Sequence, residues 1–203
     1  MRRALPLLAL LLSLTRAAQP QTLPDEPGLY AVIDTSLGTM VALLYDDKAP
    51  ITVNNFIALA TGAVETLDKS QKKMQKKPYF DGLTFHRVIP GFMIQGGDVK
   101  GTGDGNCGIK NIPDEIDPSL TFEYPGRLAM ANTGQPNSGA CQFFITVGRA
   151  EHLNGKHTIF GQLMTGFEVA NAIATVKTTP GNNRPINPVI IKSIRVLRKK
   201  VSQ

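Results

Sequence analysis

The stretch Phe85-His-Arg-Val-Ile-Pro-Gly-Phe-Met-Ile-Gln-Gly-Gly-Asp98 combines strand-like apolar residues with a turn in its middle. Its β-branched and aromatic residues are interrupted at Pro90-Gly91, which predicts a strand, a turn and a second strand. Arg87, Phe92 and Gln95 cannot share one face by a period of two, so the turn must change the register. A cation beside apolar residues is unfavourable unless it is paired or has a function. The stretch alone allows a surface arginine beside two core residues or a site built around Arg87.

Strand-like segments also lie on both sides of this stretch. Apolar runs predict strands at 30–35, 38–45, 128–132, 142–147, 158–163 and 189–197. Helical spacing of apolar residues predicts two short helices, at 50–62 and 167–176. The polar, lysine-rich segment 65–77 is expected to be an exposed loop with some helical character. Dispersed short strands with two helices indicate an all-β dominated fold, a closed antiparallel β-barrel capped by two α-helices.

The composition is that of a globular protein rather than a disordered one. Of the 203 residues, 42% are hydrophobic and 19% are charged. Trp is absent, and all but one of the 9 Phe residues lie between Phe80 and Phe167. We therefore expect one folded domain whose aromatic pocket is built from this part of the chain.

The first residues have the three parts of a secretory signal peptide. Met1-Arg2-Arg3 carries positive charge, the run from Leu5 to Leu14 is almost wholly apolar, and Ala17-Ala18 offers a small-residue cleavage site. A membrane span needs about 20 apolar residues, so a single membrane anchor is the weaker alternative. We expect a signal peptide at 1–18, a linker at 19–27, the main domain at 28–198 and a basic tail at 199–203. The expected location is outside the cytoplasm, in the periplasm first and secreted second, without a membrane span after cleavage.

The charge of the mature chain is too small to suggest nucleic-acid binding. The whole sequence has a net charge of +6, and residues 1–18 hold three of its 22 basic residues and none of its 16 acidic ones, which leaves +3. Five lysines gather in one short segment: Lys69, Lys72, Lys73, Lys76 and Lys77. Such a run is usually a solvated face, and the alternative is a docking patch for an anionic surface.

Cys107 and Cys141 are the only cysteines. In an exported protein they can form a disulfide, worth roughly 3–4 kcal/mol for a loop of this length, or remain two unpaired thiols. Their spacing fits no zinc-binding pattern, and the three histidines are too scattered to predict a metal site. Each histidine is expected on the surface of the barrel or in a pocket.

Three further segments accompany the stretch at 85–98. They are Leu128-Ala-Met-Ala-Asn-Thr133, Gln142-Phe-Phe-Ile-Thr146 and His152-Leu-Asn-Gly-Lys-His-Thr-Ile-Phe-Gly161. In their order and spacing these motifs resemble the cyclophilins, the cyclosporin-binding family of peptidyl-prolyl cis–trans isomerases. The resemblance runs from about Gly28 to Val196, and the loops around 101–114 are similar to the bacterial, exported branch. It implies an eight-stranded antiparallel barrel with two helices.

The resemblance also implies roles for individual residues. Arg87 would be the catalytic arginine, Gln95 would steady it, and Asn132 would join them in the catalytic set. Peptide-backbone contacts would fall on Ala131, Asn132 and Gln142. The proline pocket would consist of Phe92, Met93, Phe144, Leu153 and His157. His152 stands where many members have Trp, so cyclosporin binding is expected to be weakened.

The function implied is acceleration of X–Pro bond rotation in exported proteins, which would assist their folding. Rotation makes and breaks no bond, so the chemistry requires no metal or cofactor. The expected partners are proline-containing segments of unfolded or folding proteins, and the chain is expected to be a monomer. The alternative is a peptide-binding or chaperone module with incidental isomerase activity. Retention of Arg87 favours the enzyme, because binding alone needs only the pocket.

Overall fold

The computed structural model describes residues 23–201 except 71 and 105, so the predicted signal peptide lies outside the described residues. In chain order its elements are β1 (Gly28–Thr35), β2 (Gly38–Leu44), α1 (Pro50–Thr61), β3 (Thr66–Leu67), β4 (Met74–Gln75), β5 (Arg87–Ile89), β6 (Met93–Gly96), β7 (Arg127–Met130), β8 (Phe143–Thr146), the 3-10 helix η1 (Glu151–Leu153), β9 (Ile159–Thr165), α2 (Phe167–Ala174) and β10 (Ile191–Lys199). In this part of the chain no helix is long and apolar enough to cross a membrane.

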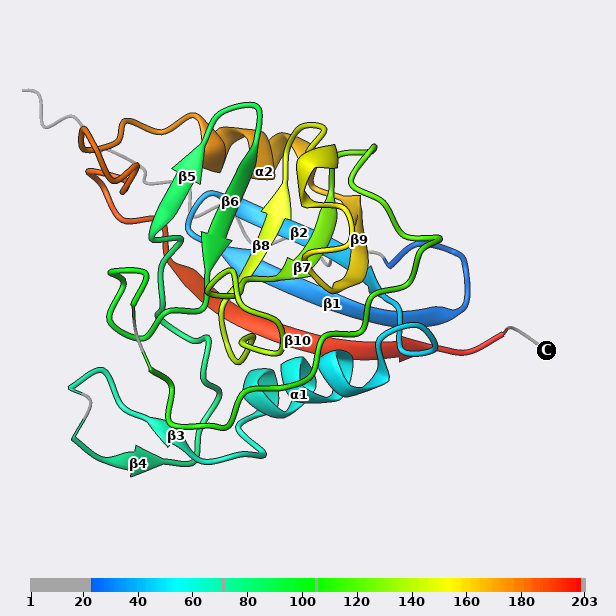
Figure 1. Cartoon of the computed structure of the whole chain (residues 1–203), viewed down its shortest axis with the longest axis horizontal. Coiled ribbons are helices and arrows are strands. Elements are labelled where there is room, and N and C mark those ends of the chain that lie inside the picture. The colour runs from blue at the N-terminus through cyan, green and yellow to red at the C-terminus, as the bar shows by residue number, and fades with distance from the viewer. Residues whose placement is uncertain (1–22, 71, 105, 202–203) are drawn as a thin grey trace, which may run out of the picture.

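One antiparallel sheet of eight strands forms the body of the protein. Its strand order is β10-β1-β2-β9-β7-β8-β6-β5, and the sheet bends so strongly that β5, β6 and β8 run across the direction of β1 and β10 (Figure 1). The helix α1 lies along β10 below the sheet, and α2 lies at the opposite end (Figure 1). The prediction of an all-β dominated fold with two helices is confirmed.

The predicted closed barrel is not confirmed, because β10 and β5 are the two edges of an open strand order. The edges are linked by backbone hydrogen bonds from the segment that precedes β5 to the start of β10 and the residues just before it. Gly82 N donates to Ile191 O at 2.8 Å, and Phe85 N donates to Val189 O at 3.0 Å. A regular ladder is interrupted here because Gly82 has a φ of +76° and Pro188 lacks an N–H group. The result is an open half-barrel.

Aromatic side chains fill the space between α1 and the inside of the sheet. Phe56 of α1 lies 5.2 Å from Phe80, 5.6 Å from Phe143 and 5.2 Å from Phe160, measured between ring centroids. All four side chains are at most 1% exposed. Such tilted and edge-on pairs add to the free energy gained by burying apolar area. This core fixes β8, which carries residues of the site on its other face.

The lysine-rich segment 65–77 contains the β3–β4 hairpin. The prediction of a loop with some helical character is therefore wrong. Thr66 pairs with Gln75 and Leu67 with Met74, and the hairpin stands away from the main sheet (Figure 1). The Asp68 carboxylate accepts hydrogen bonds from Lys72 N at 3.1 Å and Lys73 N at 3.4 Å. A short side chain that bonds to nearby backbone in this way favours a turn over a helix.

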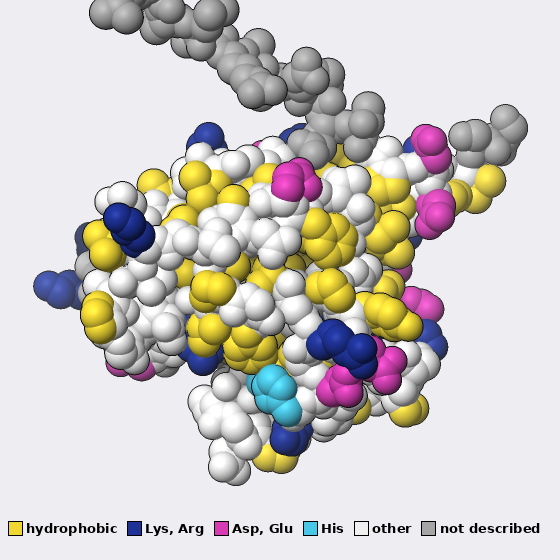
Figure 2. All heavy atoms as spheres, turned by 90° about the horizontal axis from the view of Figure 1, so that it is seen from above, with side chains coloured by type: hydrophobic (Ala, Val, Ile, Leu, Met, Phe, Trp, Pro, Cys, Tyr) yellow, Lys and Arg dark blue, Asp and Glu magenta, His cyan; other side chains and the backbone are white. Residues whose placement is uncertain are grey.

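The face seen from the α2 side carries no broad patch of a single charge. Hydrophobic side chains are spread over its middle, and acidic and basic side chains both lie mainly toward its margin (Figure 2). Isolated apolar side chains on a surface are normal and do not by themselves mark an interface.

Candidate active site

The hairpin of β5 and β6 brings Arg87 and Gln95 together. The two residues are directly paired across the strands, and Arg87 Nη1 donates to Gln95 Oε1 at 3.3 Å. The turn between them is closed by Phe92 N, which donates to Ile89 O at 3.1 Å. Gly91 has a φ of +69° in this turn, a conformation that favours glycine. The hairpin turn at Pro90-Gly91 therefore places the guanidinium beside the amide.

The hydrogen bonding continues from Gln95 toward the loop that follows β6. Gln95 Nε2 donates to Gln142 Oε1 at 3.0 Å, and Gln142 Nε2 donates to the carbonyl oxygen of Gly103 at 3.1 Å. Gln142 immediately precedes β8, whereas Gly103 belongs to the loop between β6 and β7. One side of the Arg87 guanidinium is thus held by a chain of neutral groups.

An apolar cluster lies next to these groups. Its buried side chains include Met93, Phe122 and Phe144, and Phe92 and Leu153 pack against it. Phe122 stacks on Phe144 with 5.9 Å between ring centroids and 19° between the planes. Phe122 was not predicted from the sequence as a residue of the site. No strand or helix pattern surrounds it, because it lies between the turn residues Pro118 and Pro125.

Two histidines border this cluster. The ring of His157 meets Phe144 edge-on at 5.3 Å, and its Nδ1 lies 2.9 Å from the carbonyl oxygen of Met130. A carbonyl only accepts, so Nδ1 is the donor in this contact. His152 is exposed, and its ring lies 5.3 Å from that of Phe92.

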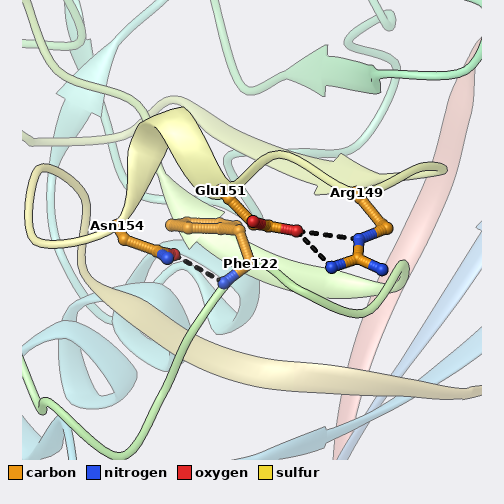
Figure 3. Close-up of polar contacts among 4 residues, drawn as sticks. All are labelled: Phe122, Arg149, Glu151 and Asn154. Atoms are coloured by element: carbon orange, nitrogen blue, oxygen red, sulfur yellow. Dashed lines mark hydrogen bonds and ion pairs between the residues drawn. The ribbon is translucent and has the colours of Figure 1, made fainter.

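The segment around η1 is fixed by contacts of its own (Figure 3). Arg149 Nε donates to Glu151 Oε1 at 2.8 Å, and the same carboxylate forms an ion pair with the guanidinium. Asn154 Oδ1 accepts a hydrogen bond from Phe122 N at 2.8 Å. The bond between Phe122 and Asn154 ties the segment that carries His152 and Leu153 to the loop that carries Phe122.

A cavity of about 370 Å³ adjoins Gln95 and Gln142. Ala131 and Asn132 lie in its wall, and so do both cysteines. The Asn132 side chain donates to Lys156 O at 2.8 Å and accepts from Gly134 N at 3.0 Å. Cys107 and Cys141 form a disulfide with 6.5 Å between their Cα atoms.

The structure brings the residues singled out from the sequence into one region. Three of them, Arg87, Gln95 and Gln142, form the hydrogen-bonded chain. The others line the adjoining apolar cluster, contact its rings or lie in the wall of the cavity. In chemical terms the region offers a half-buried guanidinium on a hairpin that also contributes to a cluster of apolar side chains.

An arginine held by amides beside apolar side chains, on a bent antiparallel sheet, is the combination to compare with known families. The family model described as "Cyclophilin type peptidyl-prolyl cis-trans isomerase/CLD" matches residues 30–196. The chain belongs to this family, and it is an enzyme, a peptidyl-prolyl cis–trans isomerase.

Relatives and solved structures agree with this assignment. Peptidyl-prolyl cis-trans isomerase A of Mycobacterium tuberculosis is 46% identical over 167 residues, which cover 82% of this chain and 91% of the relative. Peptidyl-prolyl cis-trans isomerase B of Streptomyces anulatus is 45% identical over 170 residues, covering 83% and 96%. A Cryptosporidium parvum cyclophilin-type isomerase, solved in the presence of the dipeptide Ala-Pro, matches with a TM-score of 0.70 and 33% identity, covering 84% and 99%.

Proposed function

We propose that this isomerase acts on X–Pro bonds through Arg87 and the apolar cluster of Met93, Phe122 and Phe144. The observation that carries the proposal is the hydrogen-bonded chain from Arg87 through Gln95 to Gln142, which holds the guanidinium on the hairpin that also supplies Met93 to the apolar cluster. A related structure was solved in the presence of the dipeptide Ala-Pro, which supports the same class of ligand.

The mechanism follows from the electronic structure of the amide. Rotation must overcome a barrier of roughly 18–20 kcal/mol, because the planar bond is stabilised by resonance. In the twisted transition state the proline nitrogen regains its lone pair, and Arg87 can donate a hydrogen bond to it. Such an interaction exists mainly in the transition state and therefore raises kcat.

The pocket contributes in a second way. The pyrrolidine ring would be held by Phe92, Met93, Phe144 and Leu153. These side chains would also exclude water. Because water stabilises the more dipolar planar amide, its exclusion lowers the barrier to rotation. Gln142 and the main chain of residues 131–132 would hold the peptide backbone while the carbonyl rotates. For Asn132 we assign this role to the main chain, because its side chain already bonds to Lys156 and Gly134.

The test is cis–trans exchange of a short X–Pro peptide, measured by NMR exchange spectroscopy. Purified protein is compared with its Arg87→Ala variant at equal concentration, with folding of both checked by circular dichroism. We expect fast exchange that falls by about 10²-fold or more in the variant. If the variant kept the peptide affinity and the exchange rate of the wild type, Arg87 would not be the catalytic group. If the wild type bound the peptide without accelerating exchange, the chaperone-module alternative would replace this proposal.

We further propose that the enzyme is exported and assists folding of other exported proteins, in the periplasm or after secretion. The composition of residues 1–18 supports export, because it has the charged, apolar and small-residue parts of a signal peptide. The intact mass of the protein recovered from the cell envelope and the medium tests this. A mass lacking about the first 18 residues is expected, and an uncleaved chain in the cytoplasm would contradict export.

A further inference from the structure

The chain of hydrogen bonds to Arg87 ends at a backbone carbonyl, and this end sets the direction of every bond in it. A carbonyl oxygen can only accept, so Gly103 O requires the NH2 group of Gln142 to face it. Gln142 then presents its oxygen to Gln95, and Gln95 presents its oxygen to Arg87. With Gly103 displaced, both amides could turn over, and an NH2 group would face the guanidinium. Two donors in contact would push the guanidinium away from the pocket.

Gly103 lies in a loop rather than in the sheet, so its position depends on how the loop is anchored. At the first end, the buried Asp98 carboxylate accepts hydrogen bonds from Thr102 N at 2.7 Å and from Gly103 N. The hydroxyl of Tyr79 donates to Gly97 O at 3.0 Å. These contacts hold the start of the loop against the core.

The second end of the loop is held covalently. Cys107 is joined to Cys141, the residue directly before Gln142. Both half-cystines are at most 4% exposed, and both lie in the wall of the cavity that also contains Gln95, Gly103 and Gln142. The bridge therefore joins, within a few residues on each side, the acceptor Gly103 to the donor Gln142.

We propose that the Cys107–Cys141 disulfide is a positioning element for Arg87, which acts through Gly103, Gln142 and Gln95. It keeps the loop at the distance from β8 at which Gly103 O can orient both amides. The inference rests on the proposed role of Arg87 in the reaction. It adds to that role a covalent device, formed only under oxidising conditions, that makes the catalytic arginine fully effective.

The first test removes the bridge and measures kcat and KM separately. We compare the oxidised protein with the Cys107→Ala/Cys141→Ala variant, and with wild type whose reduction is verified by thiol alkylation and mass. We expect kcat to fall by about tenfold, with a smaller change in KM, and the side-chain amide NMR signals of Gln95 and Gln142 to shift and broaden. Val32→Ala, in a buried cluster with Tyr30 and Val41, is the control for lost stability and should retain the wild-type kcat.

The second test separates positioning from general loosening of the fold. In a Gln142→Ala background the chain to Arg87 is already broken, so loss of the bridge should lower kcat by less than about twofold further. An equal loss in both backgrounds, or unchanged kcat and amide signals after reduction, would overturn the proposal. Arg87→Ala is measured alongside. If that variant were fully active, the proposed role of Arg87 would fail, whereas an inactive Arg87→Ala with an unaffected bridge variant would refute this inference alone.

Discussion

Arg87 is oriented by a neutral amide, and this choice of partner leaves its positive charge available to a ligand. Its contact is Gln95 Oε1 at 3.3 Å, and Gln95 is in turn held by Gln142. A carboxylate in that position would form an ion pair and weaken the attraction of the guanidinium for a developing lone pair. The planar guanidinium can bond to the amide and to a substrate at once, which an ammonium group does with less directional control.

This geometry predicts that Arg87→Lys is a severe change although it keeps the charge. The lysine ammonium is a point charge on a flexible chain and cannot keep the Gln95 contact and reach the prolyl nitrogen in one fixed geometry. We expect kcat/KM to fall by roughly 10²-fold, as for loss of a transition-state donor. Peptide exchange by NMR measures this, and a lysine variant with more than half the wild-type activity would show that charge alone suffices.

A second residue-scale prediction concerns His152. Its ring is exposed and lies 5.3 Å from Phe92 at the rim of the apolar cluster. Replacement by Trp offers a larger apolar face and an indole N–H donor to a bulky apolar ligand. We expect His152→Trp to tighten cyclosporin binding by about tenfold, or about 1.4 kcal/mol. Calorimetric titration checks this, with His152→Phe separating the aromatic face from the N–H donor; an unchanged Kd for the Trp variant would contradict the expectation.

Residues of the site could be predicted from the sequence where they lie within a motif. They could not be predicted where contacts with distant parts of the chain bring them into the site. Arg87 and Gln95 lie in one short stretch whose turn already implied a special geometry. Phe122 is equally part of the pocket, but it is placed by Asn154 and stacks on Phe144, both distant in sequence. The two cysteines left a bridge or free thiols open, because spacing along the chain does not specify the distance between Cα atoms.

Among the elements, η1 depends on one side-chain acceptor that links it to the Phe122 loop. Asn154 Oδ1 receives the hydrogen bond of Phe122 N (Figure 3). In Asn154→Ala the Phe122 N–H loses its acceptor, which should lower the free energy of unfolding by about 1–2 kcal/mol and raise KM as the pocket loosens. Urea denaturation and peptide titration measure the two effects. Asn154→Asp keeps the oxygen and is the matched control, so equal losses in both variants would contradict this explanation.

The helix α1 also depends on contacts that the periodicity of its sequence does not contain. Glu115 accepts hydrogen bonds from Ile51 N at 3.0 Å and from Thr52 N at 2.7 Å, at the start of the helix. These N–H groups have no partner within the helix, and a carboxylate there also favours the helix dipole. We expect Glu115→Ala to lower the free energy of unfolding by about 1–2 kcal/mol. Urea denaturation checks this for Glu115→Ala and for Glu115→Gln, which retains one acceptor oxygen. An unchanged free energy of unfolding in Glu115→Ala would refute the capping role.

Prediction of elements failed where short-range bonding competes with periodicity. The apolar spacing at 50–62 and 167–176 correctly indicated helices, because each helix buries one face against the sheet. The segment 65–77 has no apolar periodicity. The Asp68 carboxylate stabilises a turn there, because it accepts hydrogen bonds from Lys72 N and Lys73 N. Closure of the sheet depends on how its two edges meet, which alternation within single strands does not specify.

For the molecule as a whole, His86 should make stability depend on pH. It is 4% exposed, and neither ring nitrogen has a hydrogen-bond partner within the described structure. Burial lowers its pKa below the ordinary value; Arg184 and Arg87 act in the same direction and Asp98 in the opposite one. A lowered pKa in the folded state means that the neutral ring is favoured by folding.

The sign of the effect follows from proton uptake. Above an ordinary histidine pKa of about 6.5 both states are neutral at His86, and its stability contribution is fully present. As pH falls below this value the unfolded chain binds a proton before the folded one does, so stability is lost until the pH passes the folded-state pKa. The free energy of unfolding should fall by up to about 1.4 kcal/mol per pH unit within that window. Urea denaturation of wild type and His86→Leu between pH 7.5 and 5 measures it, and the difference between the two curves removes the shared contribution of the other groups. Parallel curves would show that His86 takes up its proton equally in both states.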